Sequence, residues 1–214
     1  MYREVIVKNI IESGVVAVIR LTGKEKLTKI IEALAKGGIR AMEITMTTPN
    51  AIEIISEISK KVGTDFLIGA GTVLDSETAR AVILAGAQFV VSPVTNIKMI
   101  KTVHRYDKAV FPGAFTPTEI LHAWENGADV VKVFPATALG PQFFKDIHGP
   151  LPQIRLTPTG GVSLENTGEF IRCGACCVGV GTALLNKNLI SDSDWSALSE
   201  NAKKFVDEVK KARR

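Results

Sequence analysis

The chain of 214 residues has few cysteines, few histidines and no long hydrophobic run. No stretch approaches the ~18 apolar residues of a membrane-spanning helix. The first residues carry charges where a secretion signal needs an uninterrupted apolar core. We therefore expect no membrane partner and no cleavable leader. The three cysteines, Cys173, Cys176 and Cys177, are odd in number and clustered, so we interpret them as small, reduced and mostly buried, which favours a cytoplasmic protein.

Metal-ligand clusters and dense basic patches are also lacking. The histidines, His104, His122 and His148, fall in predicted helices, and no group of His, Asp and Glu has the spacing of metal ligands. We therefore predict no required metal. The net charge is +4, with basic residues scattered except for a run over residues 210–214, which we interpret as a solvated helix end. This pattern predicts no nucleic-acid partner, and basic groups facing a pocket would suit an anionic metabolite equally well.

Short apolar runs alternate with stretches of helical periodicity along almost the whole sequence. Hydrophobic residues make up 46% and charged residues 22%, which predicts an ordered chain with a sizeable core. A helix is expected over residues 3–13. Strands, each followed by a helix, are expected at residues 15–19, 41–46, 66–70, 88–92, 109–112, 129–134, 155–159 and 175–180.

Strands interleaved with helices pair in parallel through right-handed crossovers. Eight such units without a domain-scale linker predict the α/β class, as a single (β/α)8 TIM barrel domain over residues 1–214 with an extra N-terminal helix. An open, doubly wound sheet is the alternative.

One predicted strand contains a lysine among apolar residues, Ala128-Asp-Val-Val-Lys-Val-Phe-Pro135. Burying an ammonium without a partner is costly, and burial favours the neutral amine, which is a nucleophile. Lys132 is therefore a candidate for forming a Schiff base with a carbonyl substrate. The alternative is a lysine on a half-exposed strand face, or one paired with a carboxylate.

Glu43 is the second charge inside a predicted buried strand. A lysine across the barrel can be its partner, in which case the two form a buried ion pair without chemistry. The functional interpretation is that Glu43 moves protons, through water, while the lysine forms and breaks its bond to the substrate. We favour the functional interpretation, because apolar residues would be easier to bury at both positions.

Other polar residues and glycines fall where predicted strands end, which is the active-site face of such a barrel. Arg20 could grip a substrate carboxylate in bidentate fashion, and the alternative is a surface arginine. Gly160-Gly161 and Gly181-Thr182 follow the last two strands, where glycine lets backbone N–H groups approach a phosphate, although turn geometry also explains a glycine pair. The remaining candidates at this face are Thr72, Pro93 and Phe134.

Several motifs occur together in a specific order: Met42-Glu-Ile-Thr45, Ile68-Gly-Ala-Gly-Thr-Val73, Val91-Ser-Pro93, Phe111-Pro-Gly113, Thr116-Pro-Thr-Glu119, Val131-Lys-Val-Phe-Pro135, Gly140-Pro-Gln142 and Pro158-Thr-Gly-Gly161. As a set they resemble the 2-keto-3-deoxy-6-phosphogluconate (KDPG) and 4-hydroxy-2-oxoglutarate (KHG) aldolase family, over residues 4–210. The resemblance implies a class I aldolase on a (β/α)8 barrel, usually a homotrimer, with a covalent lysine Schiff base and no metal cofactor.

The same resemblance implies roles for the candidate residues. Lys132 would form the Schiff base and Glu43 would be the general acid/base. The pyruvate half of the site would be lined by Thr72, Pro93 and Phe134. The phosphate would be held by Gly160, Gly161 and the loop at Gly181.

The implied reaction is reversible cleavage of KDPG to pyruvate and glyceraldehyde 3-phosphate, with cleavage of KHG to pyruvate and glyoxylate as a second activity. The sequence departs from the family pattern at two positions, which leaves the identity of the substrate open. Some relatives have an arginine at the position of Thr47, a role that Arg20 would take over, and some have a serine in the last phosphate loop, where Thr182 or bare backbone would serve.

Three alternatives remain open. The first is an aldolase for the galactonate-derived epimer (KDPGal). The second is a phosphosugar epimerase or isomerase that uses the same two charged residues, and the third is a barrel that only binds a phosphorylated effector.

Overall fold

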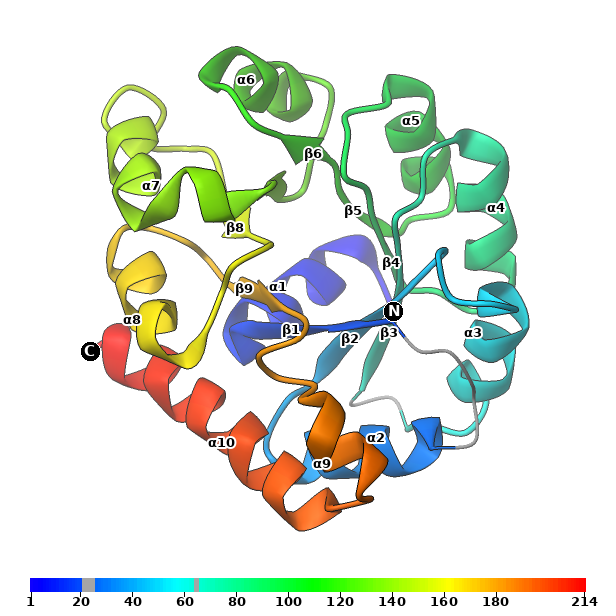
Figure 1. Cartoon of the computed structure of the whole chain (residues 1–214). Coiled ribbons are helices and arrows are strands. Elements are labelled where there is room, and N and C mark those ends of the chain that lie inside the picture. The colour runs from blue at the N-terminus through cyan, green and yellow to red at the C-terminus, as the bar shows by residue number, and fades with distance from the viewer. Residues whose placement is uncertain (21–25, 64–65) are drawn as a thin grey trace.

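The computed structural model describes residues 1–20, 26–63 and 66–214 (Figure 1). The helices are α1 (Arg3–Ser13), α2 (Leu27–Lys36), α3 (Ala51–Ser59), α4 (Ser76–Leu84), α5 (Ile97–Arg105), α6 (Pro117–Glu125), the short 3-10 helix η1 (Ala136–Ala138), α7 (Gly140–His148), α8 (Leu164–Arg172), α9 (Lys187–Ser191) and α10 (Trp195–Ala212). The strands are β1 (Val15–Ile19), β2 (Ala41–Thr45), β3 (Leu67–Gly71), β4 (Phe89–Val91), β5 (Ala109–Phe111), β6 (Gly113–Ala114), β7 (Val131–Val133), β8 (Leu156–Pro158) and β9 (Val178–Val180).

The strands form a ring of parallel pairs. One sheet has the order β5-β4-β3-β2-β1-β9 and the other has the order β6-β7-β8. Two parallel bridges, Leu156 with Ala175 and Thr159 with Gly179, join β8 to β9. Because β5 and β6 are separated only by Pro112, the chain itself connects the two sheets on the other side. The predicted barrel is confirmed, and Figure 1 shows the helices arranged around its strands.

The predicted strand at residues 109–112 ends at Phe111 as β5, and a further short strand that was not predicted, β6, follows Pro112. Proline has no N–H to give to a sheet ladder, so a strand is interrupted where one occurs. Its carbonyl still accepts the N–H of Lys132 at 2.9 Å, which keeps this strand position paired with β7. The last strand also begins later than predicted, at Val178 instead of residue 175.

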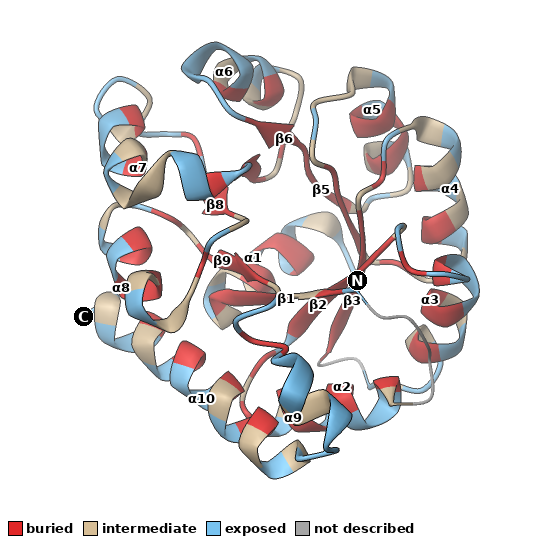
Figure 2. Ribbon diagram, in the orientation of Figure 1, coloured by how far each residue is buried: buried red, intermediate tan, exposed pale blue. Residues whose placement is uncertain are grey.

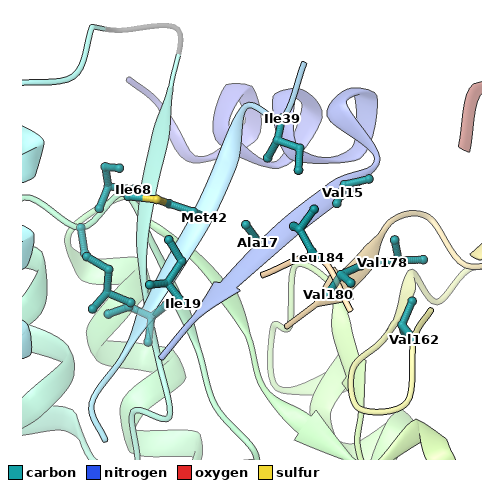
Figure 3. Close-up of a cluster of buried hydrophobic side chains, with 14 of the residues drawn as sticks. Val15, Ala17, Ile19, Ile39, Met42, Ile68, Val162, Val178, Val180 and Leu184 are labelled. Carbon is teal, nitrogen blue, oxygen red and sulfur yellow. The ribbon is translucent and has the colours of Figure 1, made fainter. Parts of the chain in front are cut away.

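Side chains alternate between two faces of the barrel wall, as the pleat of a strand requires. Val15, Ala17 and Ile19 of β1 point outward and pack with Met42, Val178 and other buried residues under the surrounding helices (Figure 3). The buried residues in Figure 2 accordingly follow the strands and the inner sides of the helices. This alternation determines which residues of each strand face the interior.

The interior of the barrel is apolar near the N-terminal ends of the strands. Helix α1 lies across this end and contributes Ile6, Val7 and Ile10 to a buried cluster. The strands contribute the residues of the inward-facing set, which are Val16, Ala41, Leu67, Phe89, Val91, Ala109, Phe111, Val130 and Cys177. The extra N-terminal helix was predicted, and the structure shows that it closes one end of the barrel.

The three cysteines are free thiols, with Cys177 buried and Cys173 and Cys176 partly buried. None of the described helices is both long enough and apolar enough to cross a membrane.

Candidate active site

Lys132 is buried inside the barrel. It is the central residue of β7, and its side chain is 5% exposed. Its neighbours Val131 and Val133 belong to the outward-facing core, so the pleat directs Lys132 to the interior. The ring of Phe134, two residues along and 37% exposed, lies with its centroid 5.0 Å from the lysine Nζ. Phe134 therefore lies on the solvent side of the amine.

Glu43 is the central residue of β2 and is 2% exposed. It belongs to the inward-facing set, since Met42 and Ile44 lie in the outward-facing core. Burial raises the pKa of the Glu43 carboxyl, and the positive charges of Lys132 and Arg20 partly offset that rise. Both cations therefore act on Glu43 through space, which places all three groups at one site.

The two buried charges do not form a tight ion pair. Among the described residues, no ion pair within 4.0 Å includes Lys132 or Glu43. A carboxyl whose pKa is raised by burial, separated from a buried amine, has the properties of a general acid/base beside a nucleophile. The gap between them leaves room for a substrate atom or a water molecule.

Gly71 provides the space for the Glu43 carboxyl, which sequence reasoning missed. It lies at the end of β3, in the strand paired with β2. A Cβ placed on Gly71 would be 2.8 Å from both Cδ and Oε1 of Glu43, which is closer than side chains pack. A glycine inside a strand is a known sign of close approach, and the sequence Gly69-Ala-Gly71 carried that sign.

Thr72 follows Gly71 with a positive φ of 57°. A β-branched residue rarely adopts this backbone conformation, and such outliers concentrate at functional sites. The Val73 N–H donates to the carbonyl of Val91 at 3.2 Å, which ties the loop after β3 to β4. Thr72 is thereby fixed at the C-terminal end of the barrel, directly after the pair that Gly71 forms with Thr45 of β2.

Pro93 lies next to the strand position that pairs with Lys132. Gly113 is the register partner of Lys132, and a Cβ on Gly113 would collide with the Pro93 carbonyl. On the other side of Lys132, the register partner is Thr157, which is buried and donates to the Cys177 carbonyl at 2.9 Å. Thr157 was not predicted, because a threonine in a strand carries no signal of its own.

The two glycine loops lie after β8 and β9. Gly160 and Gly161 have φ values of 88° and 72°, which favour glycine. No described residue accepts a hydrogen bond from the N–H of Gly160, Gly161 or Val162. A Cβ on Gly160 would be 3.7 Å from the Phe134 ring. This loop therefore presents free N–H groups close to the residue that lies over Lys132.

Arg20 is exposed at the end of β1. Its positive charge, with that of Lys132, partly offsets the rise that burial causes in the pKa of Glu43. Thr47, where some relatives have an arginine, is exposed, and its hydroxyl lies 2.9 Å from that of Thr45. The role of Arg20 in binding a substrate carboxylate stays a prediction. Within the described part of the chain, no three His, Cys, Asp or Glu residues are grouped so that they could hold a metal ion.

Comparison with known proteins gives one consistent family. The family model described as "KDPG and KHG aldolase" matches residues 6–201. The 2-dehydro-3-deoxy-phosphogluconate aldolase of Pseudomonas aeruginosa is 34% identical over 205 residues, covering 95% of this chain and 92% of that protein. The KHG/KDPG aldolase of Escherichia coli K12 is 32% identical over 206 residues, covering 95% and 96%. The chain belongs to the KDPG and KHG aldolase family.

One similar solved structure holds a covalently bound reaction intermediate. The KDPG aldolase of Legionella pneumophila, with pyruvate captured as a covalent carbinolamine, superposes with a TM-score of 0.85 at 31% identity and covers 92% of this chain and 96% of that one. The present chain is therefore an aldolase, a carbon–carbon lyase, on the barrel of its family. The predicted membership and enzyme class are confirmed.

Proposed function

We propose that this aldolase cleaves KDPG to pyruvate and glyceraldehyde 3-phosphate through a Schiff base on Lys132, and KHG to pyruvate and glyoxylate by the same route. The observation that supports the proposal most strongly is the pair of buried, inward-facing charges, Lys132 and Glu43, with the carboxyl pKa raised. The domain responsible is the single barrel of residues 1–214.

The covalent step begins when the Lys132 amine nitrogen adds to the C2 keto carbon of the substrate and forms a carbinolamine. Glu43, through a bridging water, supplies the proton with which the C2 hydroxyl leaves as water. The product is an iminium, which accepts electrons.

Cleavage follows when Glu43 removes the proton of the C4 hydroxyl. The C3–C4 bond breaks, its electron pair moves into the iminium to form an enamine, and C4 becomes the carbonyl of the released aldehyde. Protonation of the enamine at C3 and hydrolysis then yield pyruvate and free Lys132.

Substrate binding is assigned to the remaining residues at the mouth. Arg20 binds the carboxylate, since its charge already acts on the interior. Thr72, Pro93 and Phe134 line the pyruvate half, and the N–H groups of Gly160, Gly161, Gly181 and Thr182 bind the phosphate. These two small, non-basic loop segments thus determine which sugar acid fits, and KDPGal is the second candidate substrate. Family membership favours cleavage over the isomerase and effector-binding alternatives.

The test is reduction with borohydride in the presence of pyruvate. We expect the wild-type enzyme to gain the mass of a reduced pyruvate adduct at Lys132, and Lys132→Ala to gain none and to lose cleavage. Lys98→Ala, which removes an exposed lysine of α5, is the matched control and should behave as wild type. Unchanged cleavage in Lys132→Ala would defeat the covalent mechanism. Initial rates with KDPG, KDPGal and KHG compared side by side rank the substrates.

The homotrimer and the metal-free reaction stay predictions, as does the cytoplasmic location. Exposed apolar residues follow three consecutive strands of the barrel, namely Leu74, Val94 and Phe115, with exposed fractions of 51%, 48% and 38%. An apolar rim of this kind is suited to contact with a second copy of the chain, so we assign the subunit interface to it. Activity that persists after exhaustive treatment with EDTA would support the absence of a metal.

A further inference from the structure

An asparagine side chain forms hydrogen bonds with the backbone of each of the two proposed phosphate loops. Asn166 lies in the first turn of α8 and binds the loop after β8, whereas Asn201 lies in α10 and binds the loop after β9. Neither residue was singled out in the sequence. The two helices are far apart in the chain, but they pack against each other in the structure.

Asn166 makes hydrogen bonds to two successive peptide groups of its loop. Its Nδ2 donates to the Gly161 carbonyl at 2.8 Å, and its Oδ1 accepts the Ser163 N–H at 2.8 Å. The C=O and N–H of one planar trans peptide point in opposite directions. With the Gly161 carbonyl directed toward Asn166, the Val162 N–H is directed away from it, on the side where an anion can approach.

Asn201 fixes the second loop through carbonyls whose opposed N–H groups are already paired within the turn. Its Nδ2 donates to the carbonyls of Ala183 and Leu184 at 3.0 and 2.9 Å. The Gly181 carbonyl accepts the N–H groups of Leu184 and Leu185, at 3.0 and 2.9 Å. No described residue accepts a hydrogen bond from the N–H of Gly181, Thr182 or Ala183. The carbonyls of this turn are thus held on the protein side.

The packing of the first loop reinforces this arrangement. A Cβ on Gly161 would be 2.7 Å from the Thr137 hydroxyl, so the loop lies directly on η1. The Ala136 N–H donates to the Thr159 carbonyl at 2.9 Å, which joins the same two segments. The loop is therefore enclosed between η1 and Asn166, and its N–H groups are oriented before any ligand binds.

We propose that Asn166 and Asn201 are positioning residues that give this aldolase its preference for phosphorylated substrates. Asn166 holds the carbonyl opposed to the Val162 N–H, and Asn201 holds the turn that begins at Gly181 through two of its carbonyls. The N–H groups of both loops that have no described acceptor are thereby presented to the phosphate without reorganisation on binding. The proposal rests on the phosphate site of the proposed function. It predicts that the loss of either side chain weakens phosphate binding and leaves the lysine chemistry unchanged.

The experiment compares Asn166→Ala, Asn201→Ala and a control, Asn126→Ala. Asn126 donates to the His122 carbonyl at 2.8 Å at the end of α6, so the control loses a similar hydrogen bond away from the loops. Three quantities are measured: KM and kcat for KDPG, the dissociation constant of inorganic phosphate by calorimetry, and the rate of borohydride trapping with pyruvate.

We expect KM and the phosphate dissociation constant to rise together, by roughly 3- to 10-fold in each loop variant, the effect of one net hydrogen bond. The kcat, the pyruvate trapping rate and all values for Asn126→Ala should stay at wild-type levels. If Asn166→Ala fails to fold, Asn201→Ala tests the same reasoning from a different helix.

Unchanged phosphate binding in the folded loop variants would overturn the proposal, as would a parallel fall in the pyruvate trapping rate, because a general loss of structure affects both. A wild-type enzyme that neither cleaves KDPG nor traps pyruvate would instead defeat the proposed function. The phosphate titration would still decide the role of the two asparagines.

Discussion

The substitution Gly71→Ala tests whether the position of the Glu43 carboxyl determines turnover. Gly71 has no left-handed φ, so alanine introduces no backbone strain, and the only change is a methyl group aimed at Glu43. That methyl would lie 2.8 Å from Cδ and Oε1. Reaching an ordinary contact of 3.4 Å requires the carboxyl to move by more than half an ångström.

The expected effect on catalysis follows from that displacement. A misplacement of 1 Å in a catalytic group costs about 10²-fold in rate, so we expect kcat for KDPG to fall on the order of 10- to 10²-fold. Overpacking of a buried site costs about 1–3 kcal/mol of stability, which lowers the melting temperature without unfolding the barrel. KM should change little, because the phosphate loops and Arg20 are untouched.

Gly63→Ala is the matched control, since no described atom lies within 4 Å of the added methyl group. The assay is steady-state cleavage of KDPG, with pyruvate formation coupled to lactate dehydrogenase, on enzyme shown to be folded by circular dichroism. A Gly71→Ala enzyme with the turnover of the Gly63→Ala control would refute the reasoning, because the carboxyl would then act equally well from a displaced position.

The remaining predictions concern Glu43, Arg20 and the apolar rim. Glu43→Gln should lower turnover by ~10²–10⁴ in the same assay, and near-native turnover would mean that another group moves the protons. Because the pKa of Glu43 is raised above 4.5 in the folded protein, the unfolded chain releases this proton first as the pH rises. Urea titrations should therefore show wild-type stability falling relative to Glu43→Gln above pH 4.5, by at most about 1.4 kcal/mol per pH unit, until the folded pKa is passed. An opposite slope would contradict burial as the dominant cause. Arg20→Ala should raise KM for 2-oxo acids with kcat nearly constant, and an unchanged KM would remove the carboxylate assignment. We predict a trimer for the wild type in analytical ultracentrifugation and monomers for Phe115→Asp, and a Phe115→Asp protein that sediments as a trimer would place the interface elsewhere.

Much of the fold could be predicted from the sequence because each strand is a short apolar run bounded by glycine, proline or a capping residue. The start of α6 is one example, because Thr116 and Glu119 bond each other's backbone N–H in a capping box, which has a local sequence signature. The closure of the barrel was harder to predict from the sequence. It depends on bridges between β8 and β9 that no local pattern encodes, and on a strand that continues past Pro112.

The charged residues of the site could be predicted from the sequence, because burying a charge in an apolar strand is costly and therefore indicates a function. The residues that position the loops and the charged side chains could not be predicted in this way. Asn166 and Asn201 are ordinary helix residues until the loop carbonyls that they bind are known. The positive φ of Thr72 likewise depends on how the loop after β3 is tied to its neighbour, which is a long-range contact.

Because helix α1 closes one end of the barrel, it affects the order in which substrates bind and products leave. With that end filled by Ile6, Val7, Ile10 and the aromatic rings above them, traffic into and out of the barrel uses a single opening. Under the proposed chemistry, pyruvate is tethered to Lys132 at the deeper position, and the aldehyde fragment lies between it and the opening. The aldehyde must therefore depart first and, in the synthetic direction, must arrive second.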